Sequence, residues 1–169
     1  MLIRAEQPGD WDAVRAVNVS AFETPFEANL VEALRRQAKP CVSRVADDDG
    51  AIVGHIMFSP VTLSGHPTLG IMGLAPMAVS PAHQRKGIGS ALVRAGLEQC
   101  RLLGFGAVVV LGHPAFYPRF GFFPSTRFGI ACEYDVPEDV FMAVELRADY
   151  LRSSAGTIKY HAAFREEQS

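Results

Sequence analysis

The sequence predicts a mixed α/β fold of the α+β type, in which a twisted, mostly antiparallel sheet is flanked by helices. Three observations indicate this fold. Apolar residues recur at helical spacing over positions 11–34. Between about residues 40 and 79 the period changes to two, with turn signals between the runs. A strand–helix–strand pattern over about residues 68–111 then predicts one parallel junction, unlike a doubly wound fold.

Length and composition exclude several classes of protein. We expect residues 1–169 to form one domain, with a core over about residues 2–147 and an extension over 148–169 that offers an edge strand. Hydrophobic residues make up 49% of the chain, which is too many for a disordered protein. The 16 Lys and Arg residues against 18 Asp and Glu residues leave no overall charge that would attract nucleic acid or a membrane.

The targeting signals and the cysteine pattern also exclude classes of protein. The N-terminal residues carry no signal peptide, and no apolar run approaches the ~18 residues of a membrane-spanning helix. Cys41, Cys100 and Cys132 are widely spaced and form no CxxC pair or Cys/His cluster, so neither a metal site nor a disulfide framework is expected. We expect reduced, mostly buried thiols in a cytoplasmic protein.

The first predicted elements are a short strand and a helix. Leu2–Ala5 is short and apolar, as expected of an opening strand. Asp10 and Asp12 then supply acids for the start of a helix. Its apolar positions follow helical spacing and are Trp11, Val14, Val17 and Ala21.

A second helix has a sharper start signal. Thr24 stands at the capping position, Pro25 at the first helical position and Glu27 at the third, which is the pattern of a capping box. Arg35 and Arg36 suit the negative end of the helix dipole. The apolar stripe consists of Phe26, Leu30, Val31 and Leu34.

Three extended runs follow, joined by turns. Asp47–Gly50 and Gly65–Pro67 are rich in turn residues. The runs are Val42–Ala46, Ala51–Leu63 and Thr68–Val79. Pro76 interrupts the third run, and because proline cannot donate to a sheet ladder, we predict a strand that is bulged or splayed away from a neighbour there.

The longest predicted helix, Gly87–Leu103, precedes a strand covered on both faces, Ala107–Leu111. Gly104 ends this helix. Its apolar face is predicted to hold Ile88, Leu92, Ala95, Gly96 and Leu103. Further strand-like stretches are Phe128–Cys132, Val140–Leu146 and Thr157–Phe164.

The segment before the long helix has the features of a phosphate-binding loop. Gly87 and Gly89 lack side chains where backbone N–H groups could surround an anion. The helix N-terminus adds the positive end of its dipole, and Arg85 and Lys86 add full charges. A plain glycine-rich helix start is the alternative, but it leaves the basic pair unexplained.

Two other phosphate-binding motifs fail on their residues. A Walker A loop requires GxxxxGK followed by Ser or Thr, and no such string occurs in the chain. A dinucleotide fingerprint requires GxGxxG, but after Gly87-Ile88-Gly89 the third glycine position is occupied by Leu92.

The pattern Gln84-x-x-Gly87-x-Gly89 resembles the acyl-CoA pyrophosphate loop of the GNAT superfamily of N-acetyltransferases. Tyr117–Phe122 resembles the family's YxxxGF segment, and the order of predicted elements matches most of Leu2–Leu146. The run 74–79 is most similar to a branch of small, uncharacterised bacterial acetyltransferases. The resemblance implies a GNAT-like fold with a splayed strand and a βαβ unit that binds acyl-CoA.

The resemblance also implies which residues hold acetyl-CoA, the expected co-substrate. Backbone groups of Met77, Ala78 and Val79 would bind the pantetheine arm like an added strand. Arg85 or Lys86 would meet the ribose 3′-phosphate, or both would lie on the surface. The pyrophosphate would be held by the backbone of Gln84, Arg85, Lys86, Gly87, Ile88, Gly89 and Ser90. Ser90 is equally well explained as a first-turn residue.

Three residues are candidates for catalysis. An alkylammonium with a pKa of ~10.4 must lose a proton before it attacks, and Glu27 or His113 would serve as general base. Tyr117, at the family's Tyr position, would protonate the departing thiolate, and a backbone N–H near Met77 or Ala78 would meet the oxyanion. Each candidate has a plainer interpretation: Tyr117 as a packing aromatic, Glu27 as a capping residue, and His113 as a loop residue where many relatives carry Asn.

We therefore expect direct transfer of an acetyl group from acetyl-CoA to a primary amine in a ternary complex, with no metal. Alternatives are a non-catalytic acyl-CoA-binding or sensor protein and, less directly, a nucleotide-binding interaction protein. The acceptor is a small-molecule or peptide amine, and a homodimer through C-terminal edge strands is plausible. Acidic residues in the expected acceptor-side loops favour a cationic small molecule: Glu23, Glu27, Asp135, Glu138 and Asp139.

Overall fold

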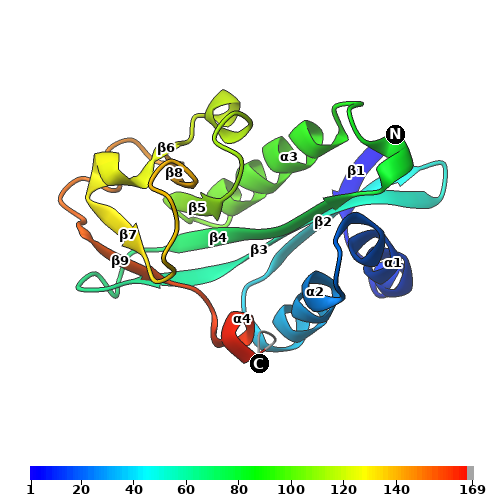
Figure 1. The fold of residues 1–169 in the computed structure, drawn as a ribbon, viewed down its shortest axis with the longest axis horizontal. Coiled ribbons are helices and arrows are strands. Elements are labelled where there is room, and N and C mark those ends of the chain that lie inside the picture. Colours follow the sequence, from blue (N-terminus) through cyan, green and yellow to red (C-terminus); the bar gives the residue numbers. More distant parts are fainter. Residues whose placement is uncertain (167–169) are drawn as a thin grey trace.

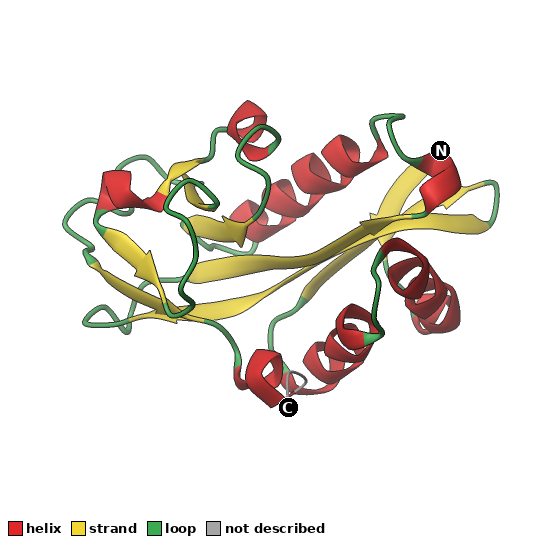
Figure 2. Ribbon diagram, viewed as in Figure 1, coloured by secondary structure: helices red, strands yellow, loops and turns green. Residues whose placement is uncertain are grey.

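A long, twisted sheet crosses the molecule and separates its helices into two layers (Figure 1 and Figure 2). The computed structural model describes residues 1–166. Neighbouring strands of the main sheet are antiparallel except β4 and β5, which are parallel. In spatial order the strands are β1 (Leu2–Ala5), β2 (Val42–Asp48), β3 (Ala51–Leu63), β4 (Ile71–Val79), β5 (Ala107–Leu111), β8 (Phe141–Glu145) and β6 (Phe123–Pro124). The predicted fold class is confirmed.

The helices cover opposite faces of this sheet. One face carries α1 (Trp11–Ala21), α2 (Phe26–Gln37) and the short α4 (Ala162–Glu166), and the other carries α3 (Ile88–Leu102) (Figure 1). Because side chains alternate along β3, this strand contributes to the apolar cores on both faces of the sheet. Met57 packs on the α1/α2 side, whereas Ile56 and Phe58 pack on the α3 side. Each face therefore has its own apolar core.

The strand β4 leaves its neighbour β5 halfway along. Parallel pairing between the two strands covers Ile71–Leu74 and then stops. The register with β3 shifts at the same place, so that Ala75 and Pro76 lie opposite the single residue Met57. The bulge and splay predicted at Pro76 are confirmed, and they create the opening around which the candidate site is built.

Three helix predictions were wrong in detail. Leu103 lies beyond the end of α3 and is 47% exposed, while Val93 and Cys100 fill the buried face instead. Trp11 is 46% exposed, because it lies under the Arg35 guanidinium rather than in the core. The capping box at α2 does not form: Thr24 Oγ1 accepts a hydrogen bond from the Phe26 N–H at 3.3 Å, and the Glu27 side chain turns elsewhere.

The C-terminal part adds a small second ladder. Strand β7 (Ile130–Cys132) pairs parallel with β9 (Gly156–Lys159), and β9 pairs antiparallel with the end of β3. The predicted strand Thr157–Phe164 was too long, because the chain turns after Lys159 and forms α4. In residues 1–166 no helix is both long and apolar enough to cross a membrane, and no cluster of three metal-ligating side chains occurs.

Candidate active site

A cleft of about 920 Å³ lies between the N-terminus of α3, the end of β4 and the aromatic segment after β5. It holds eight of the ten residues predicted to bind the cofactor, together with Tyr117 and His113. The residues that line it are Met77, Val79, His83, Gln84, Arg85, Gly87, Ile88, Gly89, Ser90, Gly112, His113, Phe116, Tyr117 and Arg119.

The first turn of α3 forms one end of this cleft. Gly87 precedes the helix with a φ of 82°, a left-handed conformation that favours glycine, and nothing lies within 4 Å of the position of an added Cβ. The first intrahelical bond runs from the Ala91 N–H to the Gly87 carbonyl. The backbone N–H groups of Ile88, Gly89 and Ser90 therefore have no partner within the helix, which suits an anion.

The end of β4 forms the floor of the cleft. The Ser80 N–H donates to the Val53 carbonyl on β3 at 2.9 Å. Because backbone groups alternate along a strand, those of Met77 and Val79 face away from β3 and into the space that β5 has vacated. Gln84 Nε2 donates to the Val79 carbonyl at 3.1 Å and so ties the loop to the strand.

Two predicted cofactor residues do not line the cleft. The backbone groups of Ala78, predicted to bind the pantetheine arm, face β3 as those of Ser80 do, and its side chain is buried. Lys86 is exposed, whereas its neighbour Arg85, with a φ of 66°, turns toward the cleft.

Arg119 and His83 also line the cleft, although no sequence motif predicted them as site residues. The Arg119 guanidinium carbon lies 4.6 Å from the centre of the Phe116 ring, and its Nε donates to the Phe116 carbonyl at 2.9 Å. His83 Nδ1 lies 2.8 Å from Ser80 Oγ. Arg119 lies within the Tyr117–Phe122 segment that carries the family resemblance. The direction of its side chain depends on the local turn, which the sequence pattern does not show.

Tyr117 is packed on all sides and still reaches the cleft. Its ring makes edge contacts with Phe116 and Phe122 at centroid distances of 5.0 and 5.5 Å. It also rests on the backbone at the end of β5, where a Cβ added to Gly112 would come within 2.2 Å of the ring. Burial raises the pKa of Tyr117 to about 12, so the phenol is protonated at neutral pH.

A second, smaller cavity of about 290 Å³ lies on the α2 side of the β4 bulge. Its lining residues are Phe22, Glu27, Leu74, Ala75, Pro76, Met77, Leu111 and Tyr117. Met77 and Tyr117 line both this cavity and the cleft, so the two spaces meet at these side chains. Within residues 1–166, Glu27 Oε2 is buried and has no hydrogen-bond partner.

The three predicted catalytic residues are thus distributed unequally. Glu27 and Tyr117, far apart in the sequence, line the same small cavity. His113 is exposed, lines only the larger cleft and lies outside the small cavity. The arrangement can accommodate an anionic ligand in the cleft and a second molecule beside Glu27.

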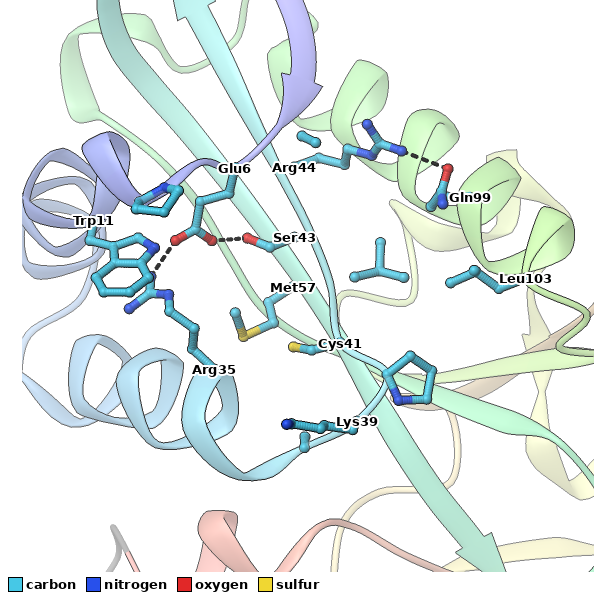
Figure 3. A pocket seen from close by; sticks show the side chains of 15 residues that line it. Glu6, Trp11, Arg35, Lys39, Cys41, Ser43, Arg44, Met57, Gln99 and Leu103 are labelled. Carbon is cyan, nitrogen blue, oxygen red and sulfur yellow. Dashed lines mark hydrogen bonds and ion pairs between the residues drawn. The ribbon is translucent and has the colours of Figure 1, made fainter.

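A third pocket, of about 570 Å³, lies at the free edge of β2 and contains none of the predicted site residues (Figure 3). Glu6 in this pocket bonds to Arg35 and Ser43. Ser43 Oγ also lies 2.8 Å from Nε2 of the fully buried His55, whose Nδ1 lies 3.2 Å from Asn18 Nδ2. Nothing in the local sequence pattern distinguishes His55, yet it joins β2, β3 and α1 in one polar network.

Burial and hydrogen bonding set the charges in this network. Burial lowers the pKa of His55, which favours the neutral imidazole. Burial alone would raise the pKa of Glu6, but the hydrogen bond from Ser43 and the proximity of Arg35 and of His55 Nε2, 3.7 Å away, hold it below its ordinary value. The network therefore holds β2, β3 and α1 together, and Glu6 carries its negative charge.

Comparison with known proteins identifies the family. The profile of the acetyltransferase (GNAT) family matches residues 11–122. The uncharacterised N-acetyltransferase YhbS of Escherichia coli is 37% identical over 165 residues, covering 97% of this chain and 98% of YhbS. The uncharacterised N-acetyltransferase YjhQ of Escherichia coli is 40% identical over 134 residues, covering 77% of this chain and 74% of YjhQ.

Solved structures agree with this match. Escherichia coli YhbS in complex with CoA superposes with a TM-score of 0.91 at 35% identity, covering 97% of this chain and 91% of that one. A GNAT family acetyltransferase from Brucella melitensis in complex with acetyl-CoA has a TM-score of 0.80 at 37% identity, covering 96% of this chain and 97% of the other. Profile, sequence relatives and fold all agree, and the chain belongs to the GNAT family of N-acetyltransferases.

Proposed function

We propose that this N-acetyltransferase binds acetyl-CoA in the cleft and transfers the acetyl group directly to a primary amine held in the small cavity. One observation carries the proposal: Met77 and Tyr117 line both spaces, so a thioester and an amine would meet beside them. The solved relatives that hold CoA and acetyl-CoA support the assignment of the cleft.

The residues of the cleft fit the co-substrate. The free N–H groups of Ile88, Gly89 and Ser90 suit the pyrophosphate, and Arg85 supplies a full charge beside them. The outward backbone groups of Met77 and Val79 suit the amides of the pantetheine arm. Acetyl-CoA supplies an activated acyl group, and the chain positions it with its thioester near Tyr117.

In the proposed reaction, Glu27 accepts a proton from the amine and Tyr117 donates a proton to the leaving thiolate. An alkylammonium with a pKa of ~10.4 is almost fully charged at neutral pH, and the carboxylate of Glu27 accepts the proton that the attacking nitrogen must lose. The neutral amine then attacks, and as the carbon–nitrogen bond forms and the carbon–sulfur bond breaks, Tyr117 donates its proton to the departing sulfur. The Tyr117 phenolate takes up the second proton that the nitrogen loses, which leaves the amide, the CoA thiol and a protonated Glu27 that releases its proton to solvent. Outward backbone N–H groups of β4 are suited to the oxyanion.

A free-thiol assay with acetyl-CoA and a panel of amines tests this proposal. We expect amine-dependent release of CoA thiol, and Tyr117→Phe should lower kcat by about 10²-fold, the lower end of a general acid's contribution. CoA affinity, measured by calorimetry, should be nearly unchanged. Tight CoA binding without thiol release for any amine would instead support a non-catalytic acyl-CoA-binding or sensor protein.

A further inference from the structure

The small cavity has an unusual distribution of charge and polarity. Among residues 1–166, Glu27 is its only charged lining residue, and the other lining side chains are apolar apart from Tyr117. Acidic residues predicted near the acceptor do not line it: Glu23, Asp135, Glu138 and Asp139. One carboxylate oxygen of Glu27 is buried and has no partner within residues 1–166, although burial of an unpaired carboxylate is costly. A ligand that brings one positive charge would satisfy it.

We propose that the acceptor is a small primary amine with a single positive charge and a compact apolar body. The proposal rests on the proposed function and goes further by naming the class of amine. A second ammonium would be buried among apolar side chains with no partner. A carboxylate next to the amine would face the Glu27 carboxylate, and no lysine or arginine lines the cavity to neutralise it.

Size supports the same class. About 290 Å³ is at the small end of the ~300–1,000 Å³ range of ligand pockets. Phe22 at the end of α1 and Leu111 at the end of β5 belong to its wall, opposite the bulge at Pro76. Such walls favour a short alkyl or aryl group and leave no polar partner for hydroxyl-rich or multiply charged amines.

Two matched pairs of amines test the proposal. Butylamine and putrescine differ only in a second amine, and phenethylamine and phenylalanine differ only in a carboxylate. We expect kcat/KM to be at least about tenfold higher for butylamine than for putrescine and for phenethylamine than for phenylalanine, and a tenfold ratio corresponds to ~1.4 kcal/mol. Equal or higher values for putrescine or phenylalanine would overturn the proposal.

A lysine side chain presents the same chemistry as a free alkylamine, so a short peptide with a blocked N-terminus and one lysine forms another arm. We expect a lower kcat/KM for this peptide than for butylamine, because the cavity is too small for the peptide backbone. A higher value would overturn the assignment of a free small amine. If no amine releases thiol while CoA still binds, the proposed function fails instead.

Variants separate recognition from folding. Glu27→Gln should weaken phenethylamine binding to the CoA complex by at least about tenfold, because the amide carries no charge. The matched control is Glu32→Gln on the same helix, whose side chain pairs with Arg15 outside the cavity. Unchanged binding in Glu27→Gln, with a melting temperature like that of the control, would contradict the role of Glu27.

A substitution in the wall of the small cavity gives a second test of the proposal. Phe22→Ala should raise kcat/KM for a bulkier amine relative to butylamine, because it removes an aromatic ring from the wall. The matched control is Phe123→Ala, since Phe123 is 43% exposed and lines neither the cleft nor the small cavity. An unaltered preference in Phe22→Ala would show that this cavity does not select the acceptor.

Discussion

Gly112 is the residue on which the position of Tyr117 depends. An added Cβ would lie 2.2 Å from the Tyr117 ring, too close for any packed contact. We expect Gly112→Ala to displace the ring and lower kcat by about tenfold or more, because misplaced catalytic groups lose much of their effect. Steady-state kinetics tests this.

Gly9→Ala is the control for that substitution, since nothing lies within 4 Å of its added Cβ. It should leave kcat unchanged. A Gly112→Ala protein that melts like the native chain and keeps full kcat would contradict the role of Tyr117 as general acid.

His55 should make the stability of the fold sensitive to mild acid. Its pKa is lowered by burial, so between the folded value and the ordinary value of about 6.5 the unfolded chain binds more protons. Stability is therefore full above that ordinary value and falls as the pH drops below it. The lowered pKa of Glu6 adds a further loss in the same direction, but only below about pH 4.3.

Urea unfolding at about pH 7.5 and about pH 5 measures this effect. His55→Gln should be less stable at the higher pH but lose less stability on acidification. His66→Gln, in the turn after β3, is the control and should keep the native pH dependence. A native-like slope in His55→Gln would assign the acid sensitivity to other groups.

At the scale of elements, the backbone conformation at the start of α3 should govern the binding of CoA in the cleft. Gly87 has a φ of 82° and Gly50, in the β2–β3 turn, has a φ of 93°; neither has an atom within 4 Å of an added Cβ. Changing either to Ala imposes the same backbone strain of about 1–2 kcal/mol. Only Gly87→Ala should also weaken CoA binding, by about tenfold in calorimetry, because it reorients the free N–H groups of the first turn.

If Gly50→Ala weakens CoA binding to the same degree, the effect is one of general stability and the loop has no special part in binding. If neither variant changes affinity, the phosphates lie away from α3.

Element boundaries were largely predictable. The bounds of β1, β3 and β5 agree with the predicted strands, because alternation and turn residues are local signals. Two of the errors concern which side of a helix is buried: Trp11 and Leu103 fit an apolar stripe but have no core beside them. Spacing defines a face, and only the neighbouring elements decide whether it is covered.

At the scale of the whole molecule, the cleft and the small cavity share the lining side chains of Met77 and Tyr117, an arrangement that favours direct transfer in the proposed reaction. Cysteine is the residue most suited to carrying an acyl group covalently, but none of the three cysteines lines the cleft or the small cavity. Burial raises the pKa of Cys41 to about 11 and that of Cys100 to about 12, which leaves both as unreactive thiols.

Mass spectrometry of the protein after incubation with acetyl-CoA alone should therefore show no added acetyl group. Initial rates with both substrates varied should give intersecting rather than parallel reciprocal plots, as expected of a ternary complex. A stoichiometric acetyl group on the protein, lost on addition of amine, would contradict direct transfer.

The sequence by itself determined the fold class, the family and the interruption of β4, and it predicted a phosphate loop, because each depends on residues close together in the chain. It also named Glu27, both as a candidate general base and as a residue of a capping box. Only the tertiary structure decided that the capping box is absent and that Glu27 and Tyr117 line one cavity, because α2 and the end of β5 meet there. The long-range packing of these elements, which local spacing does not encode, assembles the candidate site.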